Sequence, residues 1–292
     1  MTVDASDTAH PVRLAFSPDS DDLFMFWPLL EGKIDTEGVR FEAQRADTET
    51  LNTRAASGEL DVCAVSIARW PSIAERYLLL KHGMSVGRGY GPVLVALQPR
   101  SVDSLRGARI GVPGLRTTAF LVASLLLPAF EPVVVPIAPY ALAFETLKSG
   151  AVEAVLLIHE GRLTYAREGV SLVCDLGTLW AEATGGLPLP LGANAIRRGL
   201  GEARLAQVSR LVHASIAWAL SNREEILRAL LARETRRDLA LDRGLLDRYL
   251  AMYANEDTRS APRDVLEAID ELYARAFAAG RLDHPQRAEF AP

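Results

Sequence analysis

Short apolar runs alternate with amphipathic stretches over the first two thirds of the chain, from residue 13 to about residue 198. Apolar runs of this length predict buried strands, and the amphipathic stretches between them predict helices. The alternation is typical of an α/β architecture with largely parallel sheets. The strands that it predicts cover residues 12–16, 39–42, 61–67, 92–97, 109–112, 133–137, 152–158, 172–174 and 189–196.

The hydrophobic pattern changes after Gly201. Apolar residues then recur at helical spacing, as in Leu205, Val208 and Val212, and Gly280 provides a stop signal. This pattern predicts an all-helical C-terminal tail. Its helices are expected over residues 201–234, 243–255 and 262–280.

A weak internal repeat organises the strand-rich part. In segments 57–66 and 149–159 a helix ends at a Ser-Gly pair, an acidic residue precedes a buried strand, and a polar residue follows the strand. Two similar units predict two lobes, although a chance match over so few positions is the alternative. Ligands of open α/β sheets bind beyond the carboxyl ends of the strands. The polar residues Ser66 and His159 are therefore expected to face each other across a cleft between the lobes.

The expected lobes are discontinuous in the sequence. The first comprises residues 11–96 together with 195–292, which include the helical tail, and the second comprises residues 97–194.

Composition and charge exclude several classes of protein. The 292 residues are 49% hydrophobic and 24% charged, which suits a globular fold and excludes disorder. The net charge is −5 and the arginines are scattered, so we expect no nucleic-acid partner. No run of about 18 apolar residues is present to span a membrane. Residues 1–12 contain no apolar segment of a secretory signal, so we expect a cytoplasmic protein. Cys63 and Cys174 lie inside apolar runs, which indicates core packing.

His159 is the most informative single residue. An isolated histidine at the end of a buried strand is most often a hydrogen-bonded structural group. Here the sequence His-Glu-Gly-Arg interrupts an apolar strand at the edge where α/β sites lie, and an imidazole suits general-base chemistry. Glu160 could orient the ring, but the preferred interpretation places it in solvent or behind the residues that contact the ligand.

Two further segments could bind a small molecule. Residues 111–118 pass from strand to helix, so free N–H groups with the Thr117 and Thr118 hydroxyls would form an anion cradle, or the threonines are a plain helix cap. Residues 17–22 crowd three carboxyl groups before a helix, where acids also suit the helix dipole. The functional interpretation places Ser17 and Asp22 at the cleft mouth to bind ligand hydroxyls. A metal site there is only weakly supported, and we expect none.

The Gly-rich segment 85–92 resembles a nucleotide loop only superficially, because a strand and not a helix follows it. It is interpreted as backbone that needs positive φ or close ligand approach near the crossover between lobes. No serine-hydrolase, zinc-protease or Walker motif is present.

Taken together, these motifs resemble the 1,4-dihydroxy-6-naphthoate synthase family of the futalosine route to menaquinone. The resemblance extends from Ser17 to about Leu282, nearly the whole chain. Its most specific segments are residues 78–80 with 87–92, 112–118, 158–165, 175–177 with 186–192, and 253–258.

The resemblance implies a two-lobed fold similar to type II periplasmic binding proteins, used for catalysis without a cofactor. It implies that His159 is the proton acceptor and that Ser66, Thr117 and Thr118 bind substrate. The substrate would be cyclic dehypoxanthine futalosine, a carboxylated spiro-ring compound, from which a lyase releases the naphthoate. Since a base must be neutral to accept a proton, we expect the pKa of His159 near or below the working pH.

The first loop departs from the family. It usually reads Ser-Pro-Cys-Pro-Asn-Asp, whereas residues 17–22 read Ser-Pro-Asp-Ser-Asp-Asp and add two carboxyl groups near a site for an anion. Like charges there would weaken anion binding unless they point outward. The alternatives are therefore a paralogue that acts on, or only binds, another carboxylated small molecule. A solute-binding protein would ordinarily need export, and the related chorismate-dehydrating enzyme fits the His-Glu pair and paired threonines less well. Oligomeric state is not predicted.

Overall fold

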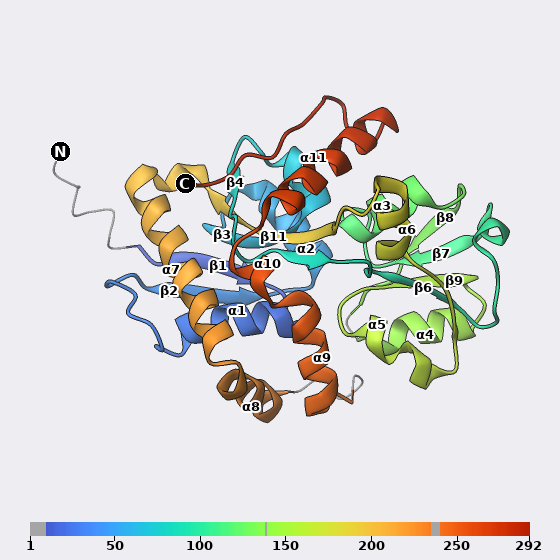
Figure 1. Ribbon diagram of the computed structural model, residues 1–292, viewed down its shortest axis with the longest axis horizontal. Coiled ribbons are helices and arrows are strands. Elements are labelled where there is room, and N and C mark those ends of the chain that lie inside the picture. Colours follow the sequence, from blue (N-terminus) through green and yellow to red (C-terminus); the bar gives the residue numbers. More distant parts are fainter. Residues whose placement is uncertain (1–9, 138, 235–239) are drawn as a thin grey trace.

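Two separate β-sheets organise the molecule, and each forms the centre of one lobe (Figure 1). The computed structural model describes residues 10–137, 139–234 and 240–292. Residues 1–9, which carry most of the segment used to predict that no secretory signal is present, lie outside the described part.

The first sheet has the strand order β2-β1-β3-β11-β4, and β5 also pairs with β11. Strand β1 is parallel to β2 and β3, whereas β11 is antiparallel to β3, β4 and β5. The strands of this sheet are β1 (Val12–Phe16), β2 (Phe41–Arg45), β3 (Val62–Ser66), β4 (Tyr77–Leu79), β5 (Ser85–Gly87) and β11 (Leu189–Arg197).

The second sheet has the order β10-β6-β9-β7-β8. Strand β7 is parallel to β8 and β9, and β6 is antiparallel to β9 and β10. The strands of this sheet are β6 (Val93–Ala96), β7 (Arg109–Val112), β8 (Glu131–Val134), β9 (Ala154–Leu157) and β10 (Ser171–Asp175).

Both sheets are mixed, so the prediction of largely parallel sheets is wrong. In each sheet one strand runs against the others: β6 in the second sheet and β11 in the first. These are the two strands by which the chain enters a sheet from the other lobe. A strand that arrives from the cleft side starts at the edge where the parallel strands end, and it must therefore run in the opposite direction.

Each of the nine predicted strands has a counterpart, with ends shifted by a few residues in most cases. The sequence did not predict β4 and β5, because three residues are too few to show an alternating pattern. The glycine caps of the repeat are confirmed, since Gly58 and Gly150 have φ of 74° and 75°. Both values lie in the left-handed region that glycine enters without strain.

Helices cover both sheets, and the C-terminal ones pack on the first lobe (Figure 1). The predicted helix over residues 201–234 is two helices, which break at Asn222. The first lobe carries α1 (Ser20–Leu30), α2 (Thr48–Arg54), α7 (Glu202–Ser221), α8 (Arg223–Arg233), α9 (Arg243–Tyr253), α10 (Glu256–Arg259) and α11 (Arg263–Ala278). The second lobe carries α3 (Thr118–Leu126), α4 (Ala141–Lys148), α5 (Gly161–Thr164) and α6 (Leu176–Thr184).

Strand pairing locates the two crossings between the lobes at residues 88–92 and 185–188, a few residues before the predicted borders at 97 and 195. The Gly-rich interpretation of the first crossing is partly confirmed, because Gly89 has φ of 75°. A Cβ on Gly91 would lie 2.9 Å from the backbone nitrogen of Gly177. The close approach at Gly91 is therefore between two backbone segments. The exact division into lobes stays a prediction.

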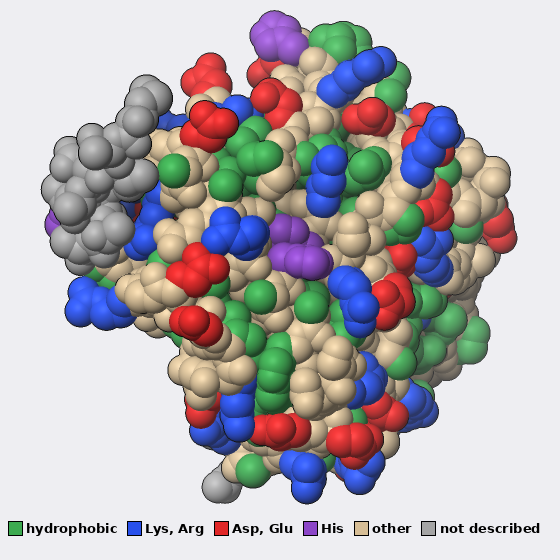
Figure 2. Space-filling view, turned by 60° about the vertical axis from the view of Figure 1, so that its left-hand side comes forward, with side chains coloured by type: hydrophobic (Ala, Val, Ile, Leu, Met, Phe, Trp, Pro, Cys, Tyr) green, Lys and Arg blue, Asp and Glu red, His purple; other side chains and the backbone are tan. Residues whose placement is uncertain are grey.

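Packing and surface agree with the composition. Cys63 and Cys174 are buried and unpaired with each other, and burial raises the pKa of both thiols to about 12, as expected of core residues. Among the described residues, no helix combines the length and apolarity needed to traverse a bilayer. Figure 2 shows acidic and basic side chains interspersed over the face that it presents, without a large area of one sign.

Candidate active site

A cavity that opens to solvent lies between the lobes, at the carboxyl ends of β1, β3 and β9, and its empty space, with part of the solvent at its opening, is about 760 Å³. This is where the topology of an α/β protein places its ligands. The cavity wall includes all the residues that the sequence singled out: Ser17, Asp22, Ser66, Thr117, Thr118 and His159. The structure therefore brings the predicted residues together, while their individual roles stay predictions.

His159 lies just beyond the end of β9, with its side chain 19% exposed. Its Nε2 is 3.1 Å from Thr48 Oγ1 and 3.4 Å from Asp19 Oδ2, and its Nδ1 is 3.3 Å from the hydroxyl of Tyr249. The backbone φ of 50° is uncommon for a residue other than glycine, and such strain concentrates at functional sites. The three contacts all come from the first lobe, whereas β9 belongs to the second.

Four buried carboxyl groups gather near this imidazole: Asp19, Asp21, Asp22 and Glu160. Burial lowers the pKa of His159, but the negative charges of Asp19 and Asp21 outweigh that effect. Glu160 and Asp22 act in the same direction, and the net result is a raised pKa. The pKa of His159 therefore lies above its ordinary value, and the expectation that it is near or below the working pH stays a prediction. The sequence did not show that the acids of the first loop face inward toward the ring.

Glu160 is completely buried, which excludes the position in solvent and leaves the alternative of a position behind the residues that line the cavity. Its Oε1 accepts hydrogen bonds from the backbone N–H of Ser20 at 3.1 Å and from the Ser20 hydroxyl at 2.6 Å. A residue of the second lobe thus satisfies an N–H group at the start of α1 in the first lobe, where the helix dipole favours a carboxylate. The hydroxyl of Tyr140 donates to Asp19 Oδ1 at 3.1 Å and makes a second contact across the cleft.

Asp22 lies on the cavity wall and accepts a hydrogen bond at 2.7 Å from the backbone N–H of Ser17. Burial, followed by the nearby charge of Asp21, raises the pKa of Asp22 to about 8. The raised pKa favours the protonated, uncharged carboxyl, which can donate as well as accept a hydrogen bond. This removes part of the negative charge that the first loop was expected to add.

Ser66 is held by Asn52, which the sequence did not single out. The Asn52 amide donates to Ser66 Oγ at 3.0 Å and accepts from the Ser66 N–H at 2.9 Å. Asn52 belongs to α2 and is fully buried. The paired bonds fix the serine hydroxyl at the end of β3, beside the cavity.

The paired threonines begin α3 and also act as caps. Thr117 Oγ1 accepts from the N–H of Phe120 at 3.1 Å and donates to the carbonyl of Gly114. Thr118 Oγ1 donates to the carbonyl of Leu191 at 2.6 Å and accepts from the N–H of Ala68. Both hydroxyls thus hold the backbone around the cavity. An anion at this end of the cavity would meet the first N–H groups of α3, which have no partners within the helix.

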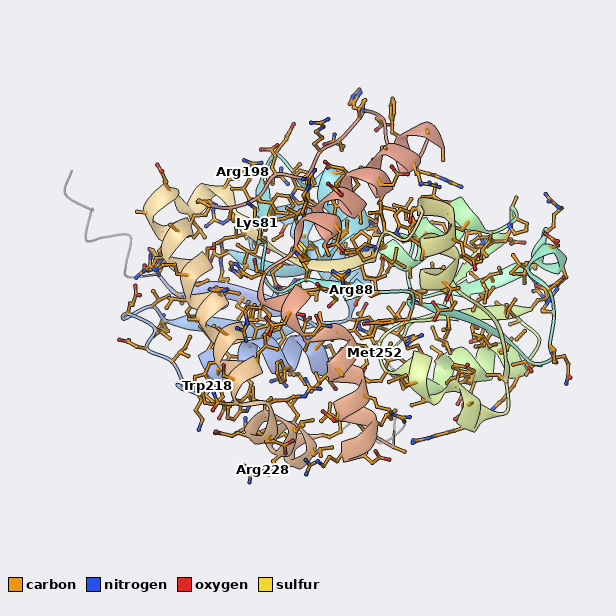
Figure 3. The ribbon with its side chains drawn as sticks, viewed as in Figure 1. Lys81, Arg88, Arg198, Trp218, Arg228 and Met252 are labelled. Atoms are coloured by element: carbon orange, nitrogen blue, oxygen red, sulfur yellow. The ribbon has the colours of Figure 1, made fainter. Side chains whose placement is uncertain are left out.

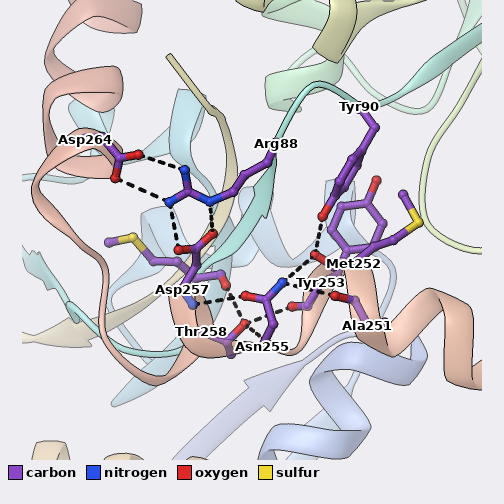
Figure 4. Close-up of polar contacts among 10 residues, drawn as sticks. Arg88, Tyr90, Ala251, Met252, Tyr253, Asn255, Asp257, Thr258 and Asp264 are labelled. Atoms are coloured by element: carbon purple, nitrogen blue, oxygen red, sulfur yellow. Dashed lines mark hydrogen bonds and ion pairs between the residues drawn. The ribbon is translucent and has the colours of Figure 1, made fainter. Parts of the chain in front are cut away.

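The first crossing between the lobes is clamped to the C-terminal helices by Arg88 (Figure 4). Its guanidinium binds Asp257 through Nε at 2.7 Å and Nη2 at 2.9 Å, and it binds Asp264 through Nη1 at 2.7 Å. Tyr90 extends the clamp, since its hydroxyl donates to the carbonyl of Met252 at 2.7 Å. We call Arg88, Asp257 and Asp264 the Arg88 clamp.

The second lobe holds the same crossing through Arg162. Its Nε donates to the carbonyl of Gly91 at 2.7 Å, its Nη2 donates to Asp175 at 2.7 Å, and its guanidinium lies 5.5 Å from the centre of the Tyr90 ring. In Figure 3 Arg88 lies at the centre of the molecule, and Met252 lies on the side of α9 that faces the second lobe. Residues 88–92 are thus fixed from both sides.

Comparisons with known proteins agree with the cleft. A family model described as menaquinone biosynthesis matches residues 12–278. A protein of Thermus thermophilus named 1,4-dihydroxy-6-naphtoate synthase is 38% identical over 269 residues, which are 92% of this chain and 95% of that protein. A Streptomyces coelicolor protein with the same name is 33% identical and covers 94% and 95% of the two chains.

The chain therefore belongs to the menaquinone-biosynthesis family of 1,4-dihydroxy-6-naphthoate synthases, which are lyases.

Solved structures agree with the predicted fold. A protein of Archaeoglobus fulgidus superposes with a TM-score of 0.84 at 39% identity and covers 94% of this chain and 99% of its own. The alkanesulfonate-binding protein of Xanthomonas axonopodis has a TM-score of 0.68 at 17% identity, with 97% and 98% coverage. That likeness shows the fold alone. The chain thus has the α/β periplasmic-binding-protein fold with C-terminal helices.

Sequence reasoning missed several residues that this family member places in or beside its cavity. It noticed Asp19 and Asp21 only as acids of a loop, and it did not single out Thr48, Asn52 or Tyr249. The only sequence pattern that pointed to any of these residues was the acid-rich loop that contains Asp19 and Asp21. Thr48, Asn52 and Tyr249 belong to no recognisable motif, because their positions depend on how α2 and α9 pack. The described residues contain no group of three or more His, Cys, Asp or Glu side chains arranged to hold a metal ion.

Proposed function

We propose that this chain converts cyclic dehypoxanthine futalosine to 1,4-dihydroxy-6-naphthoate and that His159 is the general base. The observation that carries the proposal is the position of the imidazole in a cavity between two lobes, with partners from the opposite lobe on both ring nitrogens. The matched relatives carry the name of this activity. The base removes a proton from the bound substrate, and collapse of the ring then releases the naphthoate.

The substrate carboxylate fits the end of the cavity at the start of α3. Backbone N–H groups and the helix dipole attract an anion there, and the Thr117 and Thr118 hydroxyls hold those groups in place. Ser66 and Ser17 supply polar atoms along the wall. The buried acids lie around His159 instead.

The acids near His159 need not repel the substrate. The raised pKa of Asp22 favours its uncharged form, and Asp19 faces the imidazole. Since the raised pKa of His159 favours the charged ring, the base becomes active as the pH rises through that pKa. The substrate also excludes water when the lobes close on it, which strengthens each polar contact.

The direct test is incubation of the purified protein with cyclic dehypoxanthine futalosine, with naphthoate formation followed by absorbance and mass. We expect turnover by the parent protein and a loss of about 10²–10⁴-fold in kcat for His159→Ala, the range of a removed general base. Tyr77→Phe is the control, because it removes one buried hydroxyl, bound to the Leu60 carbonyl, away from the cavity. Full activity of His159→Ala would refute the assignment of the base. Binding of the compound without turnover by the parent would favour a binding protein.

A further inference from the structure

Tyr249, which lies far from His159 in the sequence, contacts the imidazole of His159. It lies in α9 of the first lobe and is 1% exposed, and its hydroxyl is 3.3 Å from Nδ1 of His159. Tyr249 also lines the cavity. The contact therefore exists only because α9 packs against the mouth between the lobes (Figure 1).

The second partner of the Tyr249 hydroxyl determines the direction of its hydrogen bonds. Asp21 Oδ1 lies 3.0 Å from that hydroxyl, and Ser85 donates to the other oxygen of the same carboxylate at 2.8 Å. A carboxylate only accepts hydrogen bonds, so the phenolic hydrogen points to Asp21. The lone pairs of the Tyr249 oxygen are then left to accept a hydrogen from the imidazole.

We propose that Tyr249, oriented by Asp21, is a positioning residue that keeps a hydrogen on Nδ1 of His159, so that Nε2 is the atom that releases and accepts the proton. This rests on the proposed role of His159 as base. When Nε2 is deprotonated, Thr48 can donate to it, since Thr48 Oγ1 is 3.1 Å away. A defined tautomer is what a hydrogen-bonded neighbour of a catalytic histidine provides.

The other neutral tautomer, with its hydrogen on Nε2, also has hydrogen-bond partners at this site. Two acceptors, Asp19 Oδ2 at 3.4 Å and Thr48 Oγ1 at 3.1 Å, lie next to Nε2. Without the Tyr249 oxygen, these acceptors would draw the hydrogen of the neutral ring to Nε2, which could then no longer accept a proton. Asp21 stands where the first loop of the resembled family usually has asparagine, whose amide could also donate. In this chain the acceptor-only carboxylate leaves one orientation for the Tyr249 hydroxyl.

The test compares Tyr249→Phe with Tyr77→Phe, which also removes one buried hydroxyl. Ring nitrogens are labelled with ¹⁵N, and His159→Ala identifies the His159 signals among those of the 5 histidines. In the parent and in Tyr77→Phe we expect the neutral ring to carry its hydrogen on Nδ1. In Tyr249→Phe we expect the Nε2–H form to predominate, with kcat lowered about tenfold and KM changed less than twofold.

Each outcome separates this inference from the proposed function. If Tyr249→Phe retains the Nδ1–H form, or loses activity through KM alone, Tyr249 does not position the ring and the inference is wrong even though His159→Ala is inactive. If His159→Ala is fully active, the assignment of the base fails, and the comparison of the tautomer in the parent and in Tyr249→Phe still decides whether Tyr249 holds the hydrogen on Nδ1.

Discussion

The surroundings of His159 and the Arg88 clamp each combine one basic side chain with several carboxyl groups, but they differ in burial and in the excess of acid. In the clamp one guanidinium faces two carboxylates, and each oxygen–nitrogen contact joins opposite charges. Around His159 four buried carboxyl groups lie near one imidazole and raise its pKa. The clamp is partly exposed and both of its carboxylates contact the guanidinium, whereas the site is buried and has a larger excess of acid.

The pKa shifts follow from that balance. In the clamp the hydrogen bonds from Arg88 lower the pKa of Asp264. The hydrogen bonds to Asp257 and Asp264 in turn raise the pKa of Arg88. In the site the pKa of Asp22 and the pKa of His159 are both raised. A structural ion pair fixes its charges, but an unbalanced buried cluster brings protonation equilibria into the neutral range, as a proton-transfer site requires. The following experiments test this contrast.

The largest effect on stability is expected for Asp22→Asn. The pKa of Asp22 is raised from 3.8 to about 8 in the folded protein. The protonated carboxyl therefore contributes to the free energy of unfolding in full below pH 3.8, and this contribution is lost as the pH rises through about 8. The asparagine does not titrate, so we expect the variant to gain about 6 kcal/mol of unfolding free energy over the parent across this window, at about 1.4 kcal/mol per pKa unit. Urea unfolding at a series of pH values measures it. A constant difference between the two proteins would contradict the shift.

A smaller loss is expected for Arg88→Met. The variant leaves Asp257 and Asp264 facing each other without their cation, and we expect the unfolding free energy to fall by about 2 kcal/mol. The matched control is Arg263→Met, whose ion pair with Glu267 is 92% exposed at the arginine and contributes about 0–0.5 kcal/mol. Thermal unfolding compares the two. Equal effects would show that the clamp is no stronger than a surface pair.

The smallest effect is expected in the pH profile of Asp19→Asn. Asp19 is the nearest negative charge that raises the pKa of His159, and its removal lowers that pKa by about one unit. The rising limb of kcat/KM against pH should therefore move to lower pH by about one unit. Arg88→Met should leave this limb in place, because the clamp does not contact the imidazole. A limb that stays fixed in Asp19→Asn would remove Asp19 from the control of the base.

The sequence predicted the strands well because a buried strand needs a continuous apolar run, which is visible locally. It predicted the location of His159, Ser66 and the paired threonines because strand ends in α/β folds converge. It did not show that Glu160 is buried or that nearby acids raise the pKa of His159, and it was wrong about the direction of β6 and β11. Each of these depends on a contact between the lobes, which no local pattern records.

The sequence by itself determined the two α/β units, the helical tail, the family and the residues at the strand ends. These features depend on burial patterns and motifs that neighbouring residues carry. Only the tertiary structure decided that Tyr249, Asp21 and Asp19 surround one imidazole, and that Arg88 joins the lobe crossing to the C-terminal helices. The physical reason is that protonation depends on charges within a few ångströms, and chain folding alone brings those charges together.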